Sequence, residues 1–116
     1  MRFLCLYKPA KPEGTPPTPK EMAEMGKLIE ETTKSGALLL TGGIMPTAKG
    51  GARVRATAGE ITVDGPFTET KELVGGFALM QAKSREEAIA MVTRFLKIAG
   101  DGECELHQIQ EHGDNR

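Results

Sequence analysis

A chain of 116 residues is long enough for one domain with one modest hydrophobic core. Fifteen basic and sixteen acidic residues leave a net charge of −1, and the aromatic residues are four Phe, one Tyr and no Trp. Such a chain lacks the basic surface and the stacking rings typical of a nucleic-acid-binding protein. Its apolar runs, such as residues 37–40, are too short to cross a bilayer. We therefore expect a single cytoplasmic domain over residues 1–116, with no nucleic-acid or membrane partner.

The sequence predicts strands, two helices and one hairpin, with no linker between domains. In chain order they are a strand over 3–7, a helix over 19–34, a strand over 37–41, a hairpin of 52–56 with 60–63, a strand over 77–82, a helix over 85–99 and a strand over 104–111. The strands are indicated by short apolar runs or twofold alternation, and the helices by apolar residues three and four apart. The stretch between the first strand and the first helix is rich in proline, which predicts a loop.

Both helices begin with a capping box. Thr18 precedes Pro19 and stands three residues before Glu21, and Ser84 stands three residues before Glu87. Glycine follows each predicted helix and is typical of a helix end. The methionines of the first helix recur at helical spacing, so we expect them in the core.

Two helices over one face of a mostly antiparallel sheet define an α+β fold, here ferredoxin-like βαββαβ with an extra β-hairpin. The other sheet face carries no helix. If Leu106 faces the helices, His107 and Ile109 point to the uncovered face, because side chains alternate along a strand. A half-apolar uncovered face favours a homodimer formed sheet against sheet. The same strand order brings Cys5 near Cys104, and a cytoplasmic compartment favours two thiols over a disulfide.

Asp64 ends the hairpin and opens the most polar segment of the chain. One interpretation is turn chemistry, since Asp64, Gly65 and Pro66 are the residue types that tight turns use. The other is functional: a carboxylate at a strand end, close to Glu69 and Lys71, is suited to general acid–base work or ligand binding. The residue types alone leave both open.

The same segment resembles the signature of a known family. Residues 64–77, DGPFTETKELVGGF, are similar to the signature of the DGPF branch of the YCII-related family, and residues 51–55, 83–88 and 100–103 resemble its flanking segments. The resemblance covers nearly the whole chain. It implies a ferredoxin-like fold that dimerises into an α/β barrel.

The resemblance transfers only one possible catalytic group. A His–Asp pair, with its histidine on the first helix, has been suggested as the active site of the better-known branch of the family. This chain has no histidine before His107 and no carboxylate over residues 33–35, where the aspartate would fall. Asp64, within the signature, is the carboxylate that the motif supports.

Two residues of the last predicted strand compare differently with the sequence of the branch. Glu105 matches it, and His107 departs from it. The branch tends to end with a Glu-x-Arg-Pro stretch, and His107 stands here where the arginine is usual. His107 is either a sheet residue paired with Glu105 or a group that lines the cleft and titrates near neutrality. Arg53 and Arg55 share a strand face that is either solvated or suited to hold a small anionic ligand.

The sequence therefore supports two functions and does not decide between them. The first is a small enzyme with a cleft at the dimer barrel, in which Asp64 and His107 are catalytic. The ligand-binding residues would be Arg53, Arg55, Glu69, Lys71 and Glu105. The second is a non-catalytic regulatory or ligand-sensing module linked to transcription, since no nucleophile–base pair is evident. No nucleotide loop and no metal-ligand spacing are present, so we expect no cofactor and no metal.

Overall fold

The computed structural model describes residues 1–12, 15–46, 49–65 and 74–111. Its elements are β1 (Arg2–Pro9), α1 (Pro19–Lys34), β2 (Leu38–Gly43), β3 (Arg53–Thr57), β4 (Glu60–Asp64), β5 (Gly76–Gln81), α2 (Arg85–Ala99) and β6 (Gly102–Ile109). The predicted order of elements is confirmed, and most predicted bounds hold to within two residues. Among the described residues, no helix is both long enough and apolar enough to cross a membrane.

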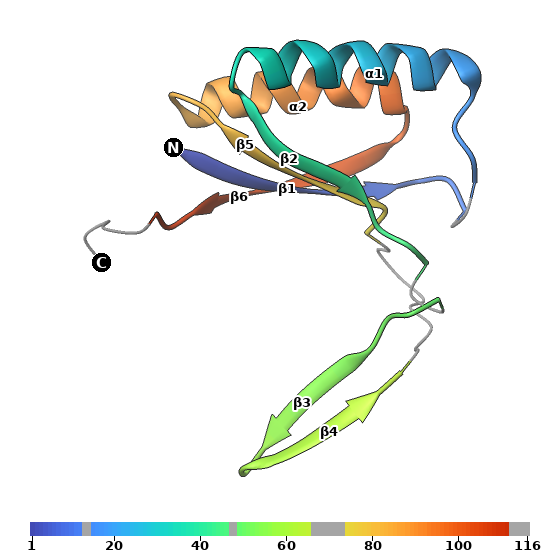
Figure 1. The fold of residues 1–116 in the computed structure, drawn as a ribbon, viewed down its shortest axis with the longest axis vertical. Helices are drawn as coiled ribbons and strands as arrows, with labels where there is room; N and C mark the ends of the chain where they lie inside the picture. Colours follow the sequence, from blue (N-terminus) through green and yellow to red (C-terminus); the bar gives the residue numbers. More distant parts are fainter. Residues whose placement is uncertain (13–14, 47–48, 66–73, 112–116) are drawn as a thin grey trace.

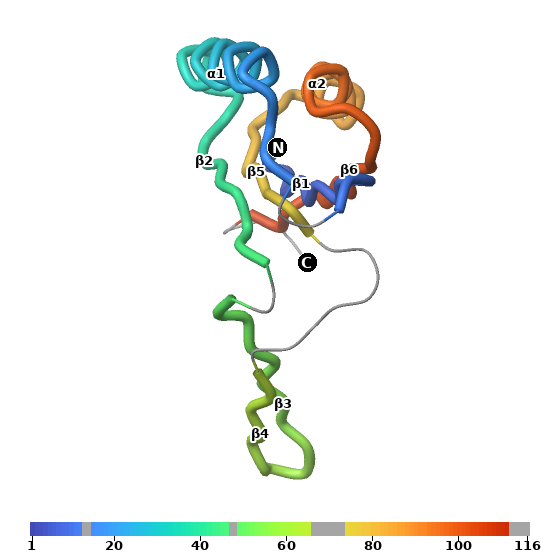
Figure 2. Tube along the Cα trace, turned by 90° about the vertical axis from the view of Figure 1, so that its right-hand side faces the viewer, coloured from blue at the N-terminus to red at the C-terminus, as the bar shows by residue number. Residues whose placement is uncertain are grey.

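The main sheet has the ferredoxin-like strand order β2-β5-β1-β6, and every neighbouring pair is antiparallel. Both helices lie on one face of this sheet, and no described helix lies on the opposite face (Figure 1). The view in Figure 2 shows α1 above β2 and α2 above the other side of the sheet. The predicted α+β, ferredoxin-like fold is therefore confirmed.

The capping boxes position both helices as predicted. Thr18 Oγ1 accepts a hydrogen bond from the Glu21 amide at 3.1 Å, and Ser84 Oγ accepts one from the Glu87 amide at 3.1 Å. Each bond satisfies one of the amide groups that a helix leaves without an internal partner. Glycine closes α2, with Gly100 at a φ of +92°.

The hydrophobic core lies mainly beneath α2. Its buried residues are Phe3, Cys5, Met80, Ala82 and Ala88. Met91 and Val92 of α2 pack against them, and the Tyr7 and Phe95 rings meet edge to face with centroids 4.9 Å apart. The two buried residues of α1, Leu28 and Thr32, do not belong to this cluster. The expectation that the α1 methionines lie in the core is wrong for Met22, which is 61% exposed because α1 stands off the sheet.

The predicted hairpin forms a separate two-stranded sheet of β3 and β4. It projects beyond the end of the main sheet (Figure 1). Ala58 and Gly59 form the turn, with φ values of +52° and +84°. Positive φ at both positions of a two-residue loop is the geometry that matches the twist of paired strands. The hairpin is therefore locally well specified, although it is an appendage to the main fold.

Candidate functional site

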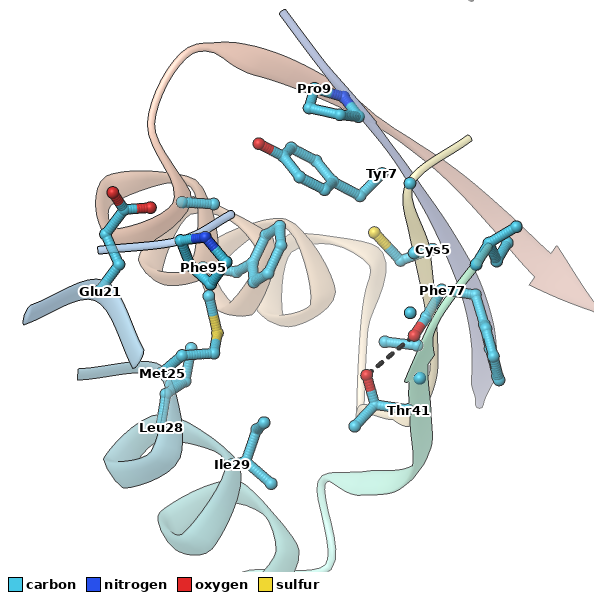
Figure 3. A pocket seen from close by; sticks show the side chains of 18 of the residues that line it. Cys5, Tyr7, Pro9, Glu21, Met25, Leu28, Ile29, Thr41, Phe77 and Phe95 are labelled. Atoms are coloured by element: carbon cyan, nitrogen blue, oxygen red, sulfur yellow. Dashed lines mark hydrogen bonds between the residues drawn. The ribbon is translucent and has the colours of Figure 1, made fainter. Parts of the chain in front are cut away.

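A cavity of about 920 Å³ lies between α1 and the helix-facing side of the sheet (Figure 3). We call it the α1 cavity. The helix contributes one long face to it: Met22, Met25, Gly26, Leu28, Ile29 and Thr32. Strand residues Cys5 and Thr41 and the α2 residue Phe95 lie across from that face. A volume of this size can hold a drug-sized molecule.

One position on the cavity face of α1 carries no bulk, which leaves room in the cavity. Gly26 has no side chain, and a Cβ placed there would meet no atom within 4 Å. Leu28 and Thr32 are buried, so the C-terminal half of α1 is anchored. The Thr32 hydroxyl donates to the Leu28 carbonyl at 2.6 Å, which satisfies it without a polar partner in the cavity.

Few polar groups line the α1 cavity, and most are already engaged. The Thr41 hydroxyl donates to the Phe77 carbonyl at 2.8 Å, as drawn in Figure 3. Lys11 and Glu21 pair at 3.2 Å, so their charges offset each other. The Lys11 ammonium is also the main reason that the pKa of Glu21 lies below its ordinary value. Desolvation raises the pKa of Tyr7, with smaller contributions from nearby acidic groups, which keeps its phenol protonated.

The thiols of Cys5 and Cys104 lie close together on the helix-facing side of the sheet. Cys5 and Cys104 are free, and the predicted proximity of the pair is confirmed by the strand register, in which Cys104 stands opposite Tyr7, two residues from Cys5 on the same sheet face. The Cys104 thiol lowers the pKa of Cys5 despite the burial of Cys5, and the Cys5 thiol raises the pKa of Cys104. No cationic group is among the causes of either shift, whereas reactive cysteines usually have a positive neighbour. The pair is therefore suited to packing more than to nucleophilic chemistry.

A polar cluster occupies the opposite, uncovered face of the sheet. Glu105 Oε2 accepts from Lys8 Nζ at 2.7 Å, and Glu105 Oε1 lies 3.5 Å from His107 Nε2. Lys8 and, secondarily, His107 lower the pKa of Glu105. The predicted pairing of His107 with Glu105 is thus present, and Lys8 is a member that the sequence did not indicate. The Lys8 side chain is only 11% exposed, whereas that of His107 is 58% exposed.

Asp64 lies apart from that cluster, on the projecting hairpin. Its carboxylate is 4.0 Å from the Arg55 guanidinium, and both side chains are 58% exposed. Arg53 stands opposite Asp64 in the strand register, so the three residues share one hairpin face. Neither Asp64 nor His107 lines the α1 cavity. The signature residues Glu69 and Lys71 lie outside the described part of the chain, and their predicted ligand contacts stay predictions.

Comparison with known proteins identifies the family. The profile of the YCII-related domain matches residues 1–109. The chain belongs to the YCII-related family. Among solved structures, this YCII-related chain is similar to 5-chloro-2-hydroxyhydroquinone dehydrochlorinase (TftG) from Burkholderia phenoliruptrix AC1100, solved in complex with 2,5-dihydroxybenzoquinone. The two are 16% identical, with a TM-score of 0.48, over 95% of this chain and 94% of that one. No curated protein matches the sequence.

In this YCII-related chain, the α1 cavity is not the ligand cleft that the sequence predicts, and a cleft at the dimer barrel stays a prediction. We expected a cleft at the uncovered face, whereas the α1 cavity lies beneath a helix. One signal was present: Gly26 interrupts the apolar stripe of α1 midway between Met22 and Ile29. A glycine at that position removes the side chain that would otherwise fill the layer. Within the described residues, no group of three or more His, Cys, Asp or Glu side chains is arranged to hold a metal.

Proposed function

We propose that this chain binds a small, uncharged and largely apolar molecule in the α1 cavity. The observation that carries the proposal is the cavity itself, about 920 Å³ in volume and lined mainly by aliphatic, aromatic and thioether side chains. Small-molecule sites in proteins have volumes of about 300–1,000 Å³ and combine an apolar lining with a few polar groups. Membership of the YCII-related family is consistent with a small-molecule role.

The polar groups favour a neutral ligand with one hydrogen-bond acceptor. The Lys11–Glu21 pair leaves no net charge to attract an ion. The Tyr7 phenol stays protonated and is a donor, because desolvation raises its pKa. A compact aromatic or alicyclic molecule with a carbonyl or ether oxygen meets these requirements.

Gly26 offers a direct test of ligand binding. Gly26→Leu adds an apolar side chain to the cavity face of α1, and Gly26→Ala is its matched control. The probe is N-phenyl-1-naphthylamine, an uncharged dye whose fluorescence rises in apolar sites. We expect saturable binding by the wild type and Gly26→Ala, and at least tenfold weaker binding by Gly26→Leu. Equal binding by the two variants, or no saturable binding by the wild type, would contradict the proposal.

Gly26→Leu must also remain folded for this result to count. Because a Cβ at this position meets no atom within 4 Å, we expect neither variant to unfold more easily than the wild type. Chemical denaturation of all three proteins checks this expectation.

An acid–base enzyme that acts at the uncovered face is the second candidate. The supporting observation is the contact of Lys8, Glu105 and His107 on that face. In this version the chain is a homodimer of the DGPF branch with a cleft at the dimer barrel, and Asp64, Arg53 and Arg55 reach a small anionic substrate there. A screen of small carboxylates and phosphates for turnover tests it. Loss of turnover in His107→Gln but not in Gly26→Leu would favour this candidate.

A regulatory, ligand-sensing role linked to transcription is the alternative to catalysis. It predicts ligand-dependent stabilisation without product. A cytoplasmic location is part of each version of the proposal. The free thiols Cys5 and Cys104 support it, because disulfides are rare in that compartment.

A further inference from the structure

The β3–β4 hairpin has one apolar face and one polar face. Val54 stands opposite Val63, and Ala56 stands opposite Ile61. These four residues form what we call the hairpin apolar face, because side chains directly opposite in an antiparallel pair share a face. The other face carries the arginines and Asp64. Such an amphipathic pattern is typical of strands that cover a hydrophobic surface.

Among the described residues, none covers this face within the single chain. Val54, Ile61 and Val63 are 63%, 64% and 65% exposed. A two-stranded hairpin alone in water is marginally stable at best. The hairpin also extends away from the main sheet, so its own sheet is out of reach (Figures 1 and 2).

The uncovered sheet face presents the matching surface. Leu4 stands opposite Leu79, Leu79 stands opposite Leu40, and Leu6 lies on the same face as Leu4. We call these four residues the sheet apolar strip. Leu40, at the edge of the sheet, is 57% exposed.

We propose that the hairpin of one protomer lies with its hairpin apolar face against the sheet apolar strip of a second copy of the chain, and that the contact is reciprocal. A second copy is favoured because both surfaces belong to the same chain and are present in equal number, which is the condition for a closed twofold assembly. The sizes also agree: a five-residue strand is about 17 Å long and the eight residues of β1 span about 27 Å. A dimer was expected from the uncovered face; the exchanged hairpin is the new element.

The size of the contact sets the expected effect. A two-stranded face of this length has a footprint of roughly 170 Å², so two arms, counted on both partners, bury on the order of 700 Å². A standard interface buries about 1,600 Å². The arms therefore account for a little under half of the area of a standard interface.

Val63→Asp tests the inference, with Thr62→Asp as the matched control on the opposite face of the same strand. A charge at Val63 is present twice in a twofold dimer, and a tenfold penalty at each contact raises the dimer dissociation constant about 100-fold. We expect less than a threefold change for Thr62→Asp. Analytical ultracentrifugation of the full chain measures both. A wild type that stays monomeric at millimolar concentration, or equal effects of the two variants, would overturn the inference.

A second measurement uses the wild type alone and does not depend on how the variants fold. Hydrogen exchange at residues 53–64 is compared above and below the dimer dissociation constant. We expect protection of these amides to rise with dimerisation, and protection that is independent of concentration would overturn the inference. The result is separable from the proposed ligand binding, because the α1 cavity lies on the other side of the sheet.

Discussion

Gly65 provides the sharpest test of what the Asp-Gly-Pro signature does structurally. Its φ is +155°, and a Cβ there would stand 2.6 Å from the Gly51 carbonyl oxygen and 2.7 Å from the Ala52 Cα. Both are backbone atoms, so neither can move aside as a side chain tip does. Forcing extra bulk into a packed site costs about 1–3 kcal/mol. The unfavourable φ adds about 1 kcal/mol. We therefore expect Gly65→Ala to cost about 2–4 kcal/mol.

Two other Gly→Ala substitutions separate these causes. Gly50 has a φ of +115° but open space around it, so Gly50→Ala should cost only about 1 kcal/mol. Gly26→Ala lies in a helix with open space and should stabilise by about 0.5–1 kcal/mol. Urea denaturation gives the global effect, and hydrogen exchange over residues 49–65 detects loss confined to the base of the hairpin. If Gly65→Ala costs no more than Gly50→Ala by both measures, the close approach is not what requires glycine.

Four further predictions follow from other parts of the chain. Ala58→Gly should slow hydrogen exchange in the hairpin, because alanine is strained at a φ of +52°; faster exchange would refute this. Asp64→Asn should leave the melting temperature within about 2 °C, because an exposed pair contributes little, and a larger drop would indicate a structural role. The pKa of Glu105 is lowered by its pairing, so the pairing stabilises the fold above the ordinary pKa of 4.5, and this stabilisation is lost as the pH falls through the lowered value. In Lys8→Met, the free energy of unfolding measured with urea should therefore fall less as the pH is lowered. An unchanged pH dependence of that free energy would contradict the prediction. Amides of α1 should exchange faster than those of α2 and gain protection when the cavity probe binds; uniform rates would count against a ligand site there.

Local sequence patterns were sufficient to predict the elements. The helix starts follow from side-chain caps at Thr18 and Ser84, which act over three residues and need no tertiary information. The strand order of the main sheet was also predictable, because two βαβ units that share one sheet allow few strand orders. The contact between Cys5 and Cys104 is a consequence of that order.

The spacing between layers could not be predicted in the same way. Periodicity assigns Met22 to the apolar stripe of α1, but it does not say how far that stripe lies from the sheet. The distance depends on how side chains from distant strands fill the volume beneath Gly26. The register shift between Leu38 and Leu40 was also missed, because a run of three leucines has no alternation to reveal a bulge. Lys8 was expected in a loop, whereas β1 continues through it and pairs it with β6.

The placement of the polar groups separates binding from acid–base chemistry in this fold. The α1 cavity and the Lys8–Glu105–His107 cluster lie on opposite faces of one sheet, and strands in a sheet leave no passage between its faces. A molecule in the cavity is therefore out of reach of His107 in the same protomer. A single site cannot use both features, so Gly26→Leu and His107→Gln should affect different activities. Loss of the same activity in both variants would mean that the sheet face and the cavity communicate through a rearrangement of α1.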